Sequence, residues 1–235
     1  MPSETQIRLF EVTTKDLDGL PDSRGESVRS MLKADHGIEI DSVRVILGYQ
    51  VKSDISDSDA EDLIYDLFAD PVIEIGSKDS RMLDGFSTHP EVAIQVGFKP
   101  GVTDNSGQAG LDGLKTLFPK QSSAKVATFT TYAFWGVPEG VSPSELAATL
   151  HNPMIERAAV TGSDGCGVGD WPLLEFPEIS PAIFQEPATI DLEVSDDELI
   201  EISEKGLLAL NLEEMRAIQA HYRDPLVRSV RKEMN

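Results

Sequence analysis

The chain of 235 residues contains a single cysteine, Cys166, which we consider first because a cysteine thiolate is a strong nucleophile. Cys166 lies in the segment SDGCGVGDWP, where Asp164 and Val168 occupy the positions that are glycine in a sharp nucleophile elbow. We therefore expect a loop without a catalytic role. The four histidines show no spacing typical of metal ligands or of a base that would activate the thiol. They are His36, His89, His151 and His221.

A second segment that could do chemistry, KPGVTDNSG at residues 99–107, contains two glycines between an expected strand and an expected helix. Free amides at the start of a helix can bind an anion. Lys99 is the only cation in the segment, so we favour a turn in which Asp104 or Asn105 caps the helix, with an interface role as the alternative. A phosphate loop that ends in Gly-Lys-Ser or Gly-Lys-Thr does not occur. We expect no catalytic, cofactor-binding or metal-binding residue in this chain.

The composition is that of an acidic globular protein, because 41 acidic residues stand against 20 basic ones and give a formal net charge of −21. Such a surface repels phosphates, so we expect no nucleic-acid partner. The sequence shows no signal-like N-terminus and no run of about 18 apolar residues, so we expect no membrane partner. A lone cysteine fits a reducing compartment, and we expect a cytoplasmic protein.

Two long stretches predict half-buried strands. Apolar residues alternate strictly in VRVILGYQV at residues 43–51, and AKVATFTTYAFWG at residues 124–136 is rich in residues that favour strands. Val43 matches Val126 and Tyr49 matches Tyr132, both at a displacement of 83 positions. This displacement suggests that the chain contains an internal duplication.

Each of these strands is followed by a helix-start signal and then by a proline turn. The helix signal is Ser58 with Glu61 in the first copy, and Ser142 with Glu145 in the second. The turn reads DPVIEIGS at residues 70–77 and NPMIERAAV at residues 152–160, and the residue before its proline is pushed out of helical geometry. A last short strand should follow each turn.

The upstream segments correspond as well, since IRLFEVTT at residues 7–14 resembles EVAIQVGF at residues 91–98, and each leads into a helix. Both copies therefore read strand, helix, long strand, helix, strand, with repeats at residues 6–76 and 91–160. Each copy has an apolar sheet face that two helices cannot fully cover. We expect an α+β fold in which the two copies form a pseudo-twofold pair, stacked sheet to sheet or joined edge to edge.

Three segments in this order resemble the N-terminal region of the family of phosphoribosylformylglycinamidine synthase, also called formylglycinamide ribonucleotide amidotransferase. VGFKPGVTDNSGQA, followed by TYAF and NPMIERA, looks like the second PurS-like repeat of that region. GIEIDSVRVILGYQV, followed by LFADPVIE, is similar to the first repeat and to the free-standing PurS subunit. The segment from Val194 to Tyr222 resembles the linker that joins the PurS-like region to the synthase domains.

The resemblance implies a duplicated PurS-like fold, built of ferredoxin-like-related βαββαβ-type modules, over residues 1–162. An extended linker and C-terminal helices would occupy residues 163–235. Four prolines in DWPLLEFPEISPAIFQEP favour an extended path for the linker. Ser195 with Glu198 and Asn211 with Glu214 are the start signals of the two helices.

The family makes formylglycinamidine ribonucleotide from formylglycinamide ribonucleotide, ATP and glutamine, in purine biosynthesis. The resemblance implies that this chain is a non-catalytic structural and assembly module of a ligase. It would bridge a glutaminase and an ATP-dependent synthetase, which would hold the ATP and the magnesium. The alternative is a stand-alone protein that binds or senses a small molecule on a duplicated ferredoxin-like scaffold, since that architecture supports many functions.

Two groups of apolar residues are candidates for the contact with these partners. The aromatics of the second long strand could lie in the core or on a docking surface, and the last helix presents apolar residues at a helical spacing. The candidate interface residues are Tyr132, Phe134, Trp135, Leu212, Met215, Ile218 and Tyr222.

Overall fold

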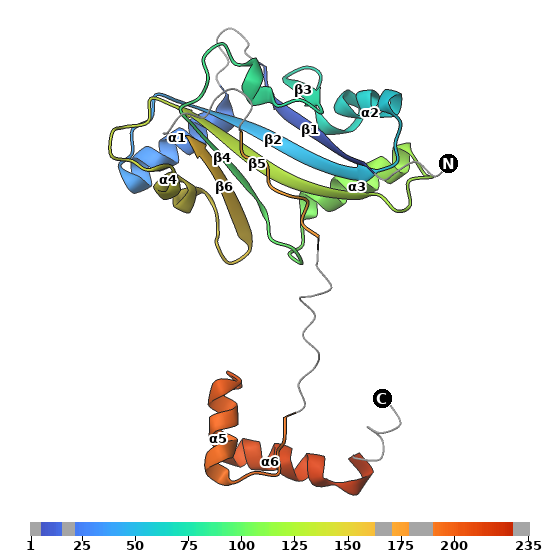
Figure 1. Cartoon of the computed structure of the whole chain (residues 1–235), viewed down its shortest axis with the longest axis vertical. Helices are drawn as coiled ribbons and strands as arrows, with labels where there is room; N and C mark the ends of the chain where they lie inside the picture. The colour runs from blue at the N-terminus through green and yellow to red at the C-terminus, as the bar shows by residue number, and fades with distance from the viewer. Residues whose placement is uncertain (1–5, 16–21, 163–170, 179–189, 228–235) are drawn as a thin grey trace. The chain divides into compact units, whose positions relative to one another are not determined.

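The computed structural model describes residues 6–15, 22–162, 171–178 and 190–227 of the chain, which forms two compact units, residues 1–179 and 180–235 (Figure 1). The first unit carries all the described strands, and the second carries two helices. The first unit extends past residue 162, the expected end of the tandem domain, because residues 171–178 pack on its sheet.

The first half of the sheet unit contains three strands and two helices. They are β1 (Gln6–Thr14), α1 (Ser23–His36), β2 (Ser42–Ser53), α2 (Asp57–Leu63) with a π-helical continuation (Ile64–Phe68), and β3 (Glu74–Lys78). The predicted start of α2 at Ser58 is wrong by two residues. Ser56 is the N-cap, because its hydroxyl accepts the N–H of Asp59 at 3.2 Å.

The second half repeats this order after a short 3₁₀ helix, Met82–Gly85. It consists of β4 (Val92–Phe98), α3 (Asn105–Leu117), β5 (Lys125–Trp135), α4 (Pro143–Leu150) and β6 (Glu156–Gly162). The predicted start of α4 is confirmed, because Ser142 and Glu145 form a capping box. Each half contributes three strands to the described sheet, so the four strands of a βαββαβ module are not found in either half.

All six strands join one antiparallel sheet in the order β3-β1-β2-β5-β4-β6, which confirms an α+β fold. The two halves meet edge to edge through β2 and β5, and Leu47 lies opposite Thr130 at this junction. The positions of Leu47 and Thr130 differ by 83, which is the displacement of the two long strands in the sequence.

The pairing register is the same in both halves. Phe10 lies opposite Tyr49 in the first half, and Ile94 lies opposite Tyr132 in the second, displaced by 84 and 83 positions. The outer pairs agree too, since β1 pairs with β3 as β4 pairs with β6: Val12 lies opposite Gly76, and Val96 lies opposite Ala158. A slip of one residue in either half would turn every side chain of a strand to the other face.

The four helices of this unit pack on one face of the sheet, over two apolar clusters. The first half supplies Phe10, Val12, Val51, Leu63 and Phe68 with Leu114 of α3. The second supplies Ile94, Val96, Phe134 and Leu146 with Leu32 of α1. Because α1 packs in the second cluster and α3 in the first, each half closes the core of the other.

Two irregular segments cover the opposite face. Residues 79–90, between the halves, and residues 171–178 contribute Leu83 and Trp171 to a third cluster with Ile46, Ala93 and Ala133. In Figure 1 residues 171–178 are the orange segment that crosses the sheet. Of the two expected arrangements, the halves adopt the edge-to-edge one, and these two segments cover the face that sheet-to-sheet stacking would have buried.

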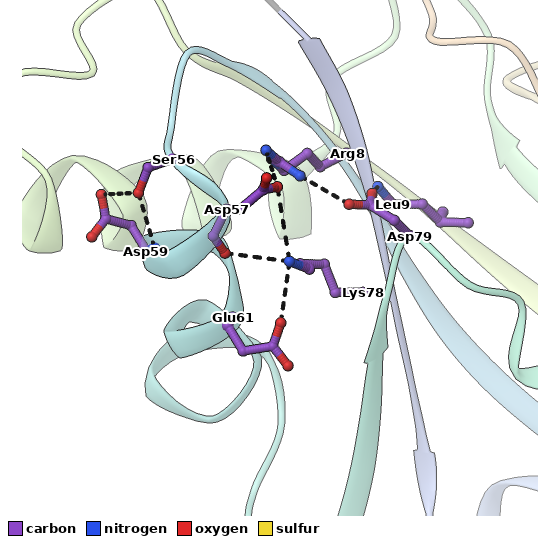
Figure 2. Close-up of polar contacts among 8 residues, drawn as sticks. All are labelled: Arg8, Leu9, Ser56, Asp57, Asp59, Glu61, Lys78 and Asp79. Atoms are coloured by element: carbon purple, nitrogen blue, oxygen red, sulfur yellow. Dashed lines mark hydrogen bonds and ion pairs between the residues drawn. The ribbon is translucent and has the colours of Figure 1, made fainter.

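Charged side chains gather between the start of α2 and the end of the edge strand β3 (Figure 2). Arg8 of β1 pairs with Asp57 at 2.7 Å and with Asp79 at 2.9 Å, while Lys78 pairs with Glu61 at 3.1 Å. These pairs attach the start of α2 to the edge of the sheet. A charged, short edge strand resists pairing with another chain.

The second unit contains α5 (Asp196–Lys205) and α6 (Leu212–Arg223). Both predicted helix starts are confirmed: Glu198 accepts the N–H of Ser195 at 2.9 Å, and Glu214 accepts that of Asn211 at 2.9 Å. Leu199 and Met215 are buried between the two helices.

Candidate functional site

An aspartate at the start of the first helix of each half also binds the middle strand of that half. Asp22, the N-cap of α1, accepts the N–H of Val45 at 3.0 Å. Asp104, the N-cap of α3, accepts the N–H of Thr128 at 2.6 Å. The predicted capping turn at Asp104 is therefore confirmed. Its carboxylate is occupied by hydrogen bonds within the chain.

A cleft lies beside each of these aspartates. The first cleft has a volume of about 670 Å³ and the second about 510 Å³. Several of their lining residues correspond in pairs that are displaced by 82 or 83 positions: Asp22 and Asp104, Glu26 and Gln108, Arg29 and Leu111, Val43 and Val126, Arg44 and Ala127. The same fold position thus forms a cleft in both halves.

The first cleft is charged and aromatic. The guanidinium of Arg44 lies over the ring of Phe86, 5.9 Å from its centre, and donates to the carbonyl of Thr14 at 2.8 Å. Trp135 meets the Phe86 ring edge to face at 5.4 Å, and its indole N–H donates to the carbonyl of Thr88 at 3.0 Å. The aromatic wall is therefore held in place by the segment between the halves.

The second cleft is mostly apolar and has a different cover. Phe176 and Pro177 of the segment 171–178 line it, together with Phe98 and Leu111. The ammonium of Lys99, at the rim of this cleft, donates a hydrogen bond to the carbonyl of Pro153. The only cation of residues 99–107 thus holds the proline turn at residues 152–156.

Each cover is attached to the sheet by one buried side chain from the first strand of its half. Glu11 of β1 accepts the N–H of Met82 at 2.6 Å and pairs with Arg81 at 2.8 Å. At the equivalent position of β4, Gln95 accepts the N–H of Leu174 at 2.6 Å. We call these two groups the Glu11 clamp and the Gln95 clamp. Burial raises the pKa of the Glu11 carboxyl, while Arg81 lowers it in part.

The two proline turns have the same hydrogen bonds. Asp70 donates its N–H to Glu74 at 2.9 Å, and Asn152 donates its N–H to Glu156 at 2.6 Å. The side chains of Asp70 and Asn152 accept the N–H groups of the residues two positions later, at 2.8 and 3.0 Å. The shared polar residue, proline and glutamate of the two motifs are therefore explained by one turn structure.

These turns also expose an aliphatic pair in each half. Val72 is 73% exposed and Met154 is 81% exposed, and the isoleucine that follows each is exposed as well. The turns precede β3 and β6, which are the opposite edges of the sheet. Because β1 and β4 run antiparallel through three antiparallel pairings, the turns lie at opposite ends too. They occupy diagonal corners of the unit.

The aromatic candidates of β5 are divided by strand alternation. Phe134 is fully buried in the core under α4, so its interpretation as an interface residue is wrong. Tyr132 is half-buried on the same face, and burial raises the pKa of its hydroxyl. Trp135 lines the first cleft and is half-buried. Trp135 is therefore the β5 candidate with a cleft beside it.

The candidates of the last helix lie in the second unit, whereas those of β5 lie in the first. Met215 is 1% exposed, because α5 packs on it, so it offers no surface to a partner. Leu212 and Ile218 are half-buried, and Tyr222 is 40% exposed. Cys166 lies outside the described residues.

Sequence reasoning missed both clamps and the first cleft. A signal was present in the strands, since Glu11 and Gln95 interrupt apolar segments at equivalent positions. Arg44 gave no such signal, because a charged residue on an alternating strand usually faces solvent.

Among the described residues no group of three or more His, Cys, Asp or Glu side chains could hold a metal ion. None of the described helices combines the length and the apolar composition that a membrane span requires. No protein-family model and no curated protein matches the chain.

Proposed function

We propose that the chain is a tandem pair of PurS-like modules with its linker, and that it acts as a non-catalytic assembly module of phosphoribosylformylglycinamidine synthase in the cytoplasm. The observation that supports the duplication is the common register. Residues 82 to 84 positions apart lie opposite partners that are themselves 82 to 84 positions apart. The equivalent aspartate caps and proline turns support it independently.

A bridging role needs two separate contact surfaces, and the two proline turns supply a pair. Each turn is fixed by its own hydrogen bonds, so an exposed aliphatic side chain there loses little conformational freedom on binding. Their places at diagonal corners allow two partners to bind without collision. We assign one corner to the glutaminase and the other to the ATP-dependent synthetase, which would hold the ATP and magnesium.

The test is sedimentation velocity of the chain with the purified synthetase and glutaminase of the same organism. Val72→Asp and Met154→Asp should each weaken one of the two complexes by about tenfold or more and leave the other unchanged. Leu173→Asp, at a residue that is 52% exposed elsewhere on the unit, is the matched control. A wild-type chain that binds neither protein would refute the bridging function.

A non-catalytic module should show no turnover by itself. The purified chain should neither hydrolyse glutamine nor consume ATP in the presence of formylglycinamide ribonucleotide. Turnover that disappears in Cys166→Ala would refute this assignment.

The first cleft favours a second candidate function, a protein that binds a small molecule on the duplicated scaffold. Its volume of about 670 Å³ lies in the range of ligand pockets, and Arg44, Phe86 and Trp135 could contact the ring of an aromatic ligand. Titration with ATP, followed by indole fluorescence, tests it. Saturable quenching that is lost in Trp135→Phe and Arg44→Ala would favour this function.

A further inference from the structure

The turn between α5 and α6 has an unusual backbone. Leu207 and Ala209 have φ angles of 51° and 54°, in the left-handed region that favours glycine. The side chain of Leu207 is 90% exposed, and that of Leu208 is 46% exposed. The turn is fixed by Ser203, whose hydroxyl donates to the carbonyl of Leu210 at 2.8 Å and accepts its N–H at 3.0 Å. The structure thus holds two leucines outward on a defined turn.

The two helices bury very little for a folded unit. Within residues 190–227 the buried residues are Leu199, Ser203 and Met215. The whole unit spans residues 180–235, and a unit of this size is only marginally stable because it buries a small fraction of its surface. Exposed leucines on such a unit therefore indicate a surface that a partner covers.

Charge decides which kind of partner fits. Residues 190–227 contain ten acidic and three basic residues. The first unit, residues 1–179, is also acidic, with 29 acidic and 14 basic residues. The first unit therefore offers no complementary net charge, and a basic protein surface is the fitting occupant of this turn.

Two carboxylates lie on the helix ends that this turn joins. Glu204, at the end of α5, and Glu213, at the start of α6, are exposed, and neither has an ion-pair partner among the described residues. By contrast, Glu201 and Asp196 pair with Lys205 and Arg216. The turn therefore presents an apolar centre between two helix ends that each carry an exposed carboxylate.

We propose that this turn inserts Leu207 and Leu208 into an apolar pocket rimmed by lysine or arginine on the synthetase. The proposal rests on the proposed function for the identity of the partner. It replaces Met215 and Ile218 of α6 with the preceding turn as the contact. Leu207 is the central residue and the two glutamates form the rim.

The experiment measures binding of the full chain to the purified synthetase by fluorescence anisotropy at several salt concentrations. Leu207→Asp should weaken binding by about 30-fold or more, as expected for a central contact. Leu207→Gly is the decisive variant, because glycine relieves the left-handed φ angle and keeps the unit folded while the side chain is lost. It should weaken binding as well. Leu226→Asp, at a 75% exposed leucine beyond α6, should bind like the wild type.

The rim is tested by Glu204→Gln with Glu213→Gln. Wild-type affinity should fall as salt rises, and the double variant should bind more weakly and depend less on salt. Salt-independent wild-type binding would overturn the basic rim. If the wild type binds and Leu207→Gly binds equally, the inference is wrong and the proposed function stands. If the wild type does not bind, the assignment of the synthetase as partner fails, and this docking site with it.

Discussion

The two halves of the sheet share their strand order, register and helix caps, but their buried polar groups are neutralised in different ways. The Glu11 clamp uses a carboxylate that is balanced by Arg81, whereas the Gln95 clamp uses a neutral amide that donates to Thr131 at 3.3 Å. Both accept a backbone N–H of the covering segment. The backbone contact is therefore common to both halves, whereas the charge of the buried side chain differs between them.

The two edges of the sheet also differ in the charge of their side chains. Arg8 and Lys78, which pair with acids beside β3, correspond by register to Val92 and Val160 in the second half. The two basic residues of Figure 2 therefore have valines at their counterpart positions. The first half protects its edge strand with charge, and the second half uses those positions for its core.

The largest expected effect compares how much equivalent buried side chains of the two halves contribute to stability. Phe134→Ala should lower the free energy of unfolding by about 3–5 kcal/mol, because a fully buried ring leaves a cavity. Its counterpart Val51→Ala should cost less, since fewer buried atoms are removed. Urea unfolding of both variants measures the difference. A cost below about 1 kcal/mol for Phe134→Ala would mean that its ring is not in the core.

The next largest effect is expected when the Gln95 clamp is given the carboxylate of the Glu11 clamp. Gln95→Glu places a buried carboxylate at a position where no arginine of the described residues is hydrogen-bonded to the side chain, unlike Arg81 at Glu11. It should lower the free energy of unfolding by about 3 kcal/mol at neutral pH. Protonation restores a neutral group, so the cost should shrink as the pH is lowered. Urea unfolding at pH 7 and pH 4.5 checks this. Equal cost at both pH values would show that position 95 is hydrated.

The Glu11 clamp should give the matching pH dependence in the wild type. Its pKa is raised above 4.5 in the folded state, so this group's contribution to stability is fully present below that pH. The contribution is lost as the pH rises through the raised pKa. Glu11→Gln keeps an oxygen for Met82 and should remove this part of the pH dependence. An unchanged pH profile of unfolding in Glu11→Gln would contradict it.

A smaller effect tests the capping aspartates as equivalents. Asp104→Ala removes a helix cap and leaves the N–H of Thr128 without its acceptor, and should cost about 2 kcal/mol. Asp22→Ala removes the same two functions and should cost a similar amount. Thermal unfolding of both variants provides the comparison. A difference of several kcal/mol between them would argue against equivalent roles.

The smallest effect concerns the edge. Lys78→Ala should cost less than about 1 kcal/mol, because its ion pairs lie near the surface. It should nevertheless increase self-association, since it removes a charge from an edge strand. Light scattering at rising protein concentration measures this, with Lys33→Ala on α1 as the control. Unchanged association in Lys78→Ala would mean that other groups protect the edge.

The strand and helix order could be predicted from the sequence because each half carries its own local signals. Alternation gave the long strands, and the turns at Pro71 and Pro153 marked the ends of the second helices. The start of α2 was missed because Ser56 and Ser58 are equally good caps by type. Only the position of the Asp59 amide distinguishes them.

The candidate sites could be predicted only in part, because they depend on contacts between distant segments. Phe134 and Met215 were read as possible contacts, yet each is covered by a helix that its local pattern does not reveal. The first cleft needs Phe86 and Trp135, which are far apart in the chain, to meet at one place. Local periodicity carries no information about such meetings.

An experimental structure of the chain tests the equivalence of the two halves most directly, through the superposition of residues 6–76 on residues 91–160. We predict that three strands and two helices align in the same order, with Leu47 opposite Thr130 at the junction. The aspartate caps and the two proline turns should coincide in that superposition. A different strand order in the two halves, or a junction in which Leu47 faces another residue, would contradict the duplication.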